Sequence, residues 1–434
     1  MDRGEVMVAR RHRMGWAVAL ALTPLMLGLD AGVTLGQEAL TRVSLDEALG
    51  LALQQNPTLR AQQFALQSTK ASEITAGLRP NPQANFLAEQ HPSGSAAIPQ
   101  YTASFGLPLE LGGKRQRRID AAHAAIQVSG YQVDDVRRQT ILQVKTAFAG
   151  ALIAREQLAL AEQNLQTLDA TERLQRVRVQ KGDLSELELL RIQVQRFTFE
   201  RDAADASQAL AAAKIALRAA AGETHLAPQF ELVGELGFPE VPLDGATLRR
   251  AALDNRPDLR AAEAERARAR ADHRLAQANA WWDITPQLEY QRIGPNNTIG
   301  FGISLPLRIF DRNQGEIART QAEIARVDAL REATALQVLA AVDTDLAAAA
   351  TQRERVLRLR DVYLPKATAA RDTVDFAYRR GGASLLDFLD AQRSYRETAL
   401  AHLQALGAYL SAIYQLEADV GRPLPEPERQ EKRN

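Results

Sequence analysis

The stretch from Ile284 to Leu307, "ITPQLEYQRIGPNNTIGFGISLPL", contains two alternating apolar and polar runs with a turn sequence between them. Apolar residues recur at every second position in both runs, and Gly-Pro-Asn-Asn occupies residues 294–297. Alternation with a period of two predicts β-strands, and a cluster of Gly, Pro and Asn predicts a reversal of the chain. The stretch therefore predicts a β-hairpin with one apolar face and one polar face.

This hairpin belongs to a unit that occurs twice in the chain. Three stretches of the first copy recur in the second: "LALQQNPTLRA" (51–61) as "AALDNRPDLRA" (251–261), "LPLELGGKRQRRI" (107–119) as "LPLRIFDRNQGEI" (305–317), and "GDLSELELLRIQ" (182–193) as "GGASLLDFLDAQ" (381–392). The shift stays near ~200 residues in all three, which is the signature of an internal repeat. We predict two copies of one unit, residues 44–222 and 245–421, joined by an irregular linker, 223–244, with at most a short strand.

Each copy reads as helix, hairpin, very long helix, turn and helix. The first helix is predicted over residues 44–78 and again over 245–280. The long helix follows over 114–181 and over 312–363, and neither range contains proline. Pro365, just after the second range, is expected to produce a kink. At 1.5 Å per residue, about 65 helical residues extend roughly 100 Å. Helices of this length predict thin antiparallel layers.

The hairpin of the first copy is predicted from strands at 83–90 and 100–109, with "HPSGSAAIP" (91–99) as its loop. Its second strand alternates clearly, whereas its first strand alternates poorly. Two hairpins give the chain four strands in an otherwise helical sequence.

Bulk composition excludes several classes of function. Lys+Arg and Asp+Glu are equal at 53 each, so no basic surplus indicates nucleic acid. Cysteine is absent, which excludes disulfides, thiolate metal sites and a cysteine nucleophile. The six histidines are scattered without ligand spacing, and no nucleophile–base pattern is found. We therefore expect neither an enzyme, nor a bound metal, nor a cofactor.

The two ends of the chain are expected to lie outside the repeats. Residues 1–36 combine a basic start with an apolar run that is too short to cross a bilayer as a helix, which predicts an export signal. An uncleaved membrane anchor is the alternative for this segment. Residues 422–434 are predicted to form a flexible tail.

The four strands have a length that suits a membrane. About 9–11 residues cross a bilayer when a strand is tilted, and an open sheet edge is untenable in lipid. Several chains must then share one closed barrel. Two chains would give eight strands and a filled interior, whereas three would give twelve and leave a lumen. We favour three. The apolar face would contact lipid through Ile284, Leu288, Tyr290, Ile299, Phe301, Ile303 and Leu305.

The organisation and motifs resemble the TolC-like outer membrane efflux proteins. The motifs are "NPTLRA" (56–61), "RPDLRAA" (256–262) and "YRRGGASLLDFLDAQRSY" (378–395). The resemblance implies a mostly α fold with a transmembrane β part: a homotrimer with a twelve-stranded barrel in the outer membrane and a helical tunnel in the periplasm. It also implies two partners, a periplasmic adaptor and an inner-membrane pump. "LELGGKRQRRI" (109–119) further resembles the branch that serves cobalt–zinc–cadmium pumps of the RND type. This resemblance implies an exit duct that passively conducts heavy-metal cations from the pump and adaptor to the exterior.

The resemblance also assigns roles to residues near the second long turn. Asp387 and Asp390 match acidic positions that line the narrow periplasmic aperture and select ions. Two carboxylates three residues apart share one helix face, although acids at a helix start are also favoured by its dipole. Tyr378 matches a tyrosine that helps to lock the closed aperture. The turns that would contact the adaptor are Lys181, Gly182 and Asp183 in the first copy and Arg380, Gly381 and Gly382 in the second.

Two alternatives remain open from the sequence. Within the same class, the channel would export drugs or proteins instead of heavy-metal cations. In a different class, the chain would be a periplasmic coiled-coil adaptor, although adaptors normally have one long helical hairpin rather than two.

Overall fold

The structure, a computed structural model, describes residues 40–93, 96–222 and 226–424. The predicted export signal, 1–36, lies outside these residues. The helices are α1 (Leu45–Gln55), α2 (Pro57–Gly77), α3 (Lys114–Gln180), α4 (Glu186–Ala221), α5 (Gly245–Asn255), α6 (Pro257–Ala278), α7 (Gln314–Arg358), the π-helical turn η1 (Leu359–Tyr363), α8 (Leu364–Arg379) and α9 (Leu385–Val420). The strands are β1 (Leu40–Val43), β2 (Gln83–Ser93), β3 (Ala96–Gly106), β4 (Leu109–Glu110), β5 (Leu226–Leu232), β6 (Asp283–Ile293) and β7 (Asn296–Ser304).

The prediction of a single helix at the start of each copy is wrong. The helix is interrupted at Asn56 and at Arg256, where ψ is 121° and 123°. A proline follows each residue and disfavours the helical conformation before it. Asn56 accepts hydrogen bonds from two backbone N–H groups at the start of α2 and donates to the carbonyl of Ala220, 3.0 Å away. Arg256 likewise reaches Asp419 of α9 at 3.0 Å. Each break thus fastens the first helices of a copy to its last helix.

The long helices are present in both copies. α3 runs without interruption for 67 residues. In the second copy the corresponding path is α7, η1 and α8, and the π-helical turn ends two residues before Pro365. A proline removes one backbone hydrogen bond, and a π turn is one way to continue the helix past it. Among the described residues, the run Gln314–Arg379 is the one helix with the length and composition to cross a membrane. It packs along α6 and α9.

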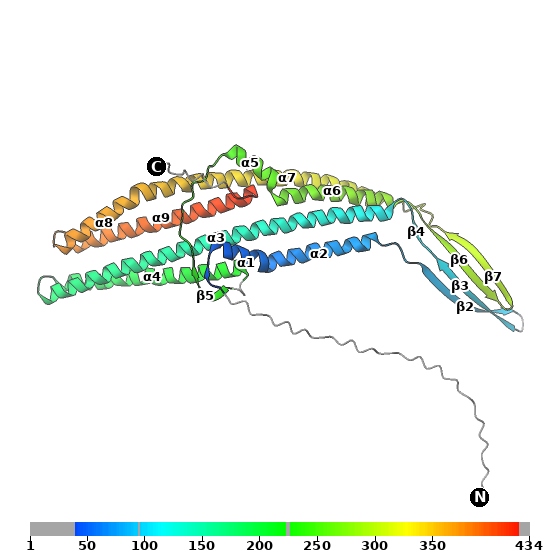
Figure 1. Cartoon of the computed structure of the whole chain (residues 1–434), viewed down its shortest axis with the longest axis horizontal. Coiled ribbons are helices and arrows are strands. Elements are labelled where there is room, and N and C mark those ends of the chain that lie inside the picture. Colours follow the sequence, from blue (N-terminus) through cyan, green and yellow to red (C-terminus); the bar gives the residue numbers. More distant parts are fainter. Residues whose placement is uncertain (1–39, 94–95, 223–225, 425–434) are drawn as a thin grey trace, which may run out of the picture. The chain divides into compact units, whose positions relative to one another are not determined.

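The two hairpins join into one antiparallel sheet, shown together with the helices in Figure 1. β2 pairs with β3, β3 with β6, and β6 with β7. The predicted loop at 91–99 is wrong, because β2 and β3 remain paired up to Ser93 and Ala96. Apolar and polar residues alternate poorly in the first strand, so the sequence did not predict this part of the first hairpin. In the described chain, β2 and β7 each have one partner only, so both edges of the sheet carry unpaired backbone groups.

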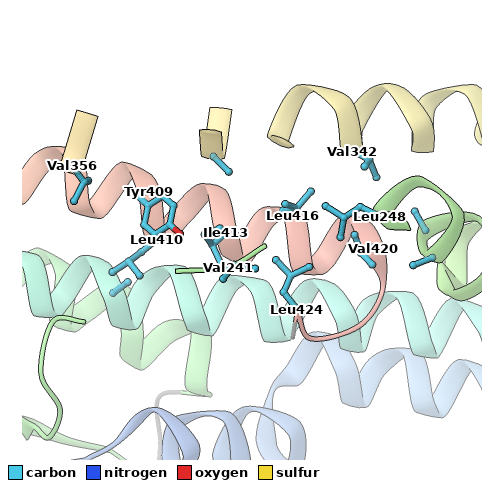
Figure 2. Close-up of a cluster of buried hydrophobic side chains, with 14 of the residues drawn as sticks. Val241, Leu248, Val342, Val356, Tyr409, Leu410, Ile413, Leu416, Val420 and Leu424 are labelled. Atoms are coloured by element: carbon cyan, nitrogen blue, oxygen red, sulfur yellow. The ribbon is translucent and has the colours of Figure 1, made fainter. Parts of the chain in front are cut away.

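A hydrophobic cluster holds the middle of the helical region together. β1 pairs in parallel with β5, and the linker then runs across α9, where the hydroxyl of Tyr409 donates to the carbonyl of Pro239 at 2.5 Å. Figure 2 shows this cluster, in which Leu410, Ile413 and Leu416 project from α9. Leu424 is buried in the same cluster. Of the predicted flexible tail, 422–434, residues 422–424 are described and residues 425–434 lie outside the described chain.

Candidate aperture and membrane face

Two tight turns connect the helical hairpins, α3 to α4 and α8 to α9. Gly182 and Gly381 both have φ of +80°, a left-handed conformation that favours glycine. The turns have matching hydrogen bonds, since the backbone N–H of Gly182 donates to Val179 and that of Gly381 donates to Tyr378, both at 3.0 Å. The six residues predicted to contact an adaptor are all exposed: Lys181, Gly182, Asp183, Arg380, Gly381 and Gly382.

Asp387 and Asp390 lie on one exposed face at the start of α9. The carboxylate of Asp387 accepts hydrogen bonds from the backbone N–H of Ser384 at 3.0 Å and from its hydroxyl at 2.7 Å, which completes a capping box. These hydrogen bonds, first from the hydroxyl and then from the backbone, lower the pKa of Asp387. Asp390 instead forms an ion pair with Arg393 at 2.5 Å. Asp387 thus has a structural task as a helix cap, and the charge of Asp390 is partly compensated.

Tyr378 is buried where the two helical hairpins meet. Its ring stacks on Phe388 with centroids 4.9 Å apart, and its hydroxyl accepts a hydrogen bond from the side-chain amide of Gln175 on α3. Burial, and then the negative charge of Glu188, raise the pKa of Tyr378 to about 12, so the phenol stays protonated. The tyrosine therefore bonds a helix of the second copy to a helix of the first.

Two further contacts connect the same hairpins, and sequence reasoning did not identify them. The guanidinium of Arg178 donates to the carbonyl of Arg379 at 2.5 Å. Arg396 on α9 pairs with Asp202 on α4 at 2.8 Å. Both contacts join residues about 200 positions apart, so no local sequence pattern indicates them. The ion pair of Asp390 with Arg393, in contrast, could be predicted from their i,i+3 spacing on one helix.

The apolar residues of the sheet share one face. Residues directly opposite each other on paired strands point to the same side, and the pairing brings Phe105, Leu288 and Phe301 into one row and Ala103, Tyr290 and Ile299 into another. The opposite face carries Gln287, Glu289 and Gln291. Ile303 pairs with Pro286 on the apolar face, Ile284 lies on the same face opposite Leu109, and the exposed Leu305 follows directly after β7. The residues predicted to face lipid thus share one side, whereas the other side is mainly polar and also carries Leu87 and Ile293.

No site for a bound metal ion is found among the residues that the structure describes. No group of three or more His, Asp or Glu side chains lies close enough together there. His273 is engaged by Thr320 and Gln277, both at 2.9 Å, and His123 pairs with Glu73.

Long antiparallel helices that carry an amphipathic four-stranded sheet define a subunit of an outer membrane channel. Residues 48–223 and 248–422 match the family described as outer membrane efflux protein, so the chain belongs to this family. It is an outer membrane efflux channel protein, which excludes the periplasmic adaptor alternative.

Three relatives and one solved structure illustrate the similarity. The cobalt-zinc-cadmium resistance protein CzcC of Cupriavidus metallidurans is 30% identical over 89% of this chain and 92% of its own length. The nickel-cobalt-cadmium resistance protein NccC of Alcaligenes xylosoxydans is 26% identical over 67% of this chain and 66% of its own. The pyoverdine export outer membrane protein OpmQ of Pseudomonas aeruginosa is 26% identical over 85% of this chain and 83% of its own. A crystal structure of CusC, described with its folding and transmembrane channel formation, is 18% identical, with a TM-score of 0.73 over 87% of this chain and 92% of that chain.

Proposed function

We propose that three copies of this chain form one outer membrane barrel of twelve strands above a helical tunnel. The observation that carries the proposal is the pair of open sheet edges, β2 and β7, on a sheet with an apolar face. In lipid each unpaired backbone group costs several kcal/mol, so the edges need partners. The antiparallel β7 edge of one chain fits the β2 edge of the next, and a third chain leaves room for a water-filled lumen.

In this assembly the start of α9 forms the narrow periplasmic end. Three copies of Asp387 and Asp390 would place six carboxylates around one opening, which favours cations over anions. Tyr378 and Gln175 would hold the opening closed, because their bond joins the two hairpins that have to separate when it widens. The glycine turns beside this opening are exposed, which suits contact with a periplasmic adaptor.

The substrate class proposed is heavy-metal cations, delivered by an RND-type inner-membrane pump through the adaptor. CzcC and NccC, which support this proposal, are named for resistance to cobalt, cadmium and zinc or nickel. An acidic opening suits passive conduction of cations, because it attracts them, whereas an ion that was strongly bound would not leave. The similarity to OpmQ keeps export of an organic compound as the second candidate.

Deletion of the gene tests the substrate. The deletion strain should become sensitive to zinc, cobalt or cadmium, and the wild-type gene should restore resistance. Sensitivity only to organic compounds would instead support the second candidate.

Conductance through planar bilayers tests the aperture. Asp390→Asn should reduce cation preference, whereas Arg393→Gln should increase it, because Arg393 compensates the carboxylate of Asp390 at 2.5 Å. Arg358→Gln, which removes an exposed arginine far along the helix from the turn, is the matched control. Equal reversal potentials for all three variants in a salt gradient would contradict the assignment of Asp390 to the aperture.

A further inference from the structure

Two carboxyl groups meet where the first and last helices of the second copy come together. Arg256, at the break between α5 and α6, pairs with Asp258 at 2.8 Å and with Asp419 near the end of α9 at 3.0 Å. The carboxyl group of Asp345 on α7 is within hydrogen-bonding reach of Asp419, which is the one charged group in the described chain that acts appreciably on it. Asp345 and Asp419 therefore have one guanidinium between them, and Asp258 already uses part of it.

This acid pair borders the hydrophobic cluster of Figure 2, in which Val342 of α7 and Leu416 and Val420 of α9 are completely buried. The side chain of Asp419 is only 5% exposed, and its Oδ2 atom has no hydrogen-bond partner among the described residues. Two ionised carboxylates can only accept hydrogen bonds, and burial penalises a second negative charge. A proton on Asp345 would remove that charge and supply the donor that Oδ2 of Asp419 lacks.

The basic side chains around the acid pair have partners of their own. On α3 and α5 they form three further ion pairs: Arg138 with Asp135 at 2.7 Å, Lys145 with Glu417 at 2.6 Å, and Arg249 with Asp343 at 2.8 Å. Because each of these cations has a carboxylate of its own, a proton is the charge that balances Asp345. Burial first, and then the hydrogen bond with Asp419 and its negative charge, raise the pKa of Asp345 to about 7, which agrees with this balance.

The first copy of the repeat contains a neutral version of the same junction. Its residues at the positions of Arg256, Asp345 and Asp419 are Asn56, Ala147 and Ala220. There the side-chain amide of Asn56 donates to the carbonyl of Ala220 at 3.0 Å, so the helices are joined without any charge. The repeat unit thus folds with alanine at both positions, and packing alone does not require the acids of the second copy.

We propose that Asp345 and Asp419 share one proton, that this proton fastens α7 to α9, and that the fastening weakens when the proton leaves at alkaline pH. The junction of the second copy is then a pH-sensitive clamp. Once the proton is lost, two negative charges lie side by side at the edge of the hydrophobic cluster and repel each other. The clamp belongs to a single chain and does not depend on the proposed barrel.

The clamp has a place in the proposed channel. α9 extends from this junction to the turn that precedes Asp387 and Asp390. The shared proton would therefore fix one end of the helix whose other end would line the aperture. In alkaline surroundings this end of α9 would be held less firmly against α7, whereas the neutral junction of the first copy would not change with pH.

Infrared spectroscopy of the full chain in detergent tests where the proton is held, because a protonated carboxyl group absorbs at a higher frequency than a carboxylate. We expect one such band to disappear between about pH 5.5 and 8.5. Asp345→Asn should lack this band, and Glu332→Gln, which removes an exposed carboxylate of the same helix, should keep it. Asp419→Asn should lower the midpoint by about one pH unit or more, because the neighbouring charge is lost. The same band in Asp345→Asn, or an unchanged midpoint in Asp419→Asn, would overturn the shared proton.

Amide hydrogen exchange tests whether the proton fastens the two helices. After correction for the intrinsic exchange rate, the opening equilibrium of residues 338–349 and 413–420 should rise about threefold or more between about pH 5.5 and 7.5 and level off above about pH 8, a value reduced for solvent screening. Glu332→Gln should show the same rise, whereas Asp345→Asn should show none. No rise in the wild-type protein, or an equal rise in Asp345→Asn, would refute the clamp and leave the proposed channel intact.

Discussion

Removing the hydroxyl of Tyr378 should open the aperture. In Tyr378→Phe the ring keeps its stack on Phe388, but the side-chain amide of Gln175 loses its acceptor. Gln175 is completely buried, and its carbonyl oxygen has no partner in the described chain, so rotation of the amide cannot compensate. An unpaired buried donor costs about 1–3 kcal/mol. In the proposed channel, water would solvate the amide once the hairpins separate and the cost would disappear, so the substitution should destabilise the closed state selectively.

The size of the effect follows from this cost. A loss of about 1.4 kcal/mol in each protomer shifts the ratio of closed to open hairpins about tenfold. Single-channel recording in planar bilayers should show a correspondingly larger fraction of time at high conductance. Tyr290→Phe is the matched control, because it also removes a hydroxyl bond, to Asn297 at 2.7 Å, but in the sheet.

A double substitution distinguishes loss of the hydrogen bond between Gln175 and Tyr378 from a general loss of stability in this region. Replacing both partners of a buried hydrogen bond by apolar groups of similar shape is nearly neutral. Tyr378→Phe combined with Gln175→Leu should therefore stay closed for more of the time than Tyr378→Phe alone. An unchanged closed fraction in Tyr378→Phe, or a double variant that opens further, would refute the reasoning.

Two other predictions concern the helical region. Burial and the neighbouring carboxyl of Asp419 raise the pKa of Asp345 to about 7, above its ordinary value of 3.8. The stability that Asp345 contributes is then full below about pH 4 and is lost as the pH rises through 7, so the unfolding temperature should fall across this window. Asp345→Asn should remove this pH dependence and stabilise the protein at pH 8 by about 1 kcal/mol, a value reduced for solvent screening. An unfolding temperature that fell equally steeply with pH in the variant would exclude Asp345 as the source of the pH dependence. Gly421→Ala should destabilise by about 2 kcal/mol or more, because φ is +75° and the new Cβ would lie 3.0 Å from the backbone of Asn255. Gly315→Ala, which meets no neighbouring atom, is its control in thermal unfolding, and equal melting of the two variants would contradict the close contact.

The repeated pattern made the fold largely predictable from the sequence. Alternation in the stretch 284–307 and the proline-free run 114–181 each reflect one dominant local preference, and both elements formed as expected. The breaks at Asn56 and Arg256 were also encoded locally, since a proline follows each. The prediction of one continuous helix in each copy was wrong because it gave these two prolines no weight.

Pairings between distant residues could not be predicted in this way. The parallel pairing of β1 with β5 joins segments about 190 residues apart, and Tyr378 meets Gln175 across 203 positions. Neither contact leaves a periodic signal, because each depends on how the two copies pack against each other. The capping role of Asp387 was predictable, since a serine three residues before an acid at a helix start is the capping-box pattern.

Disulfide cross-linking in the membrane tests most directly whether chains share their strands. One cysteine replaces Ala88 on β2, and a second replaces Phe301, Ile303 or Leu305 in turn along the β7 edge, all on the apolar face. Side chains directly opposite on antiparallel strands are about 4.5–5.5 Å apart, close to the separation that a disulfide needs. We expect one of the three pairs to give covalent dimers and trimers, with nothing larger. Exclusively monomeric protein from all three pairs, under oxidation that modifies every thiol, would contradict the shared barrel.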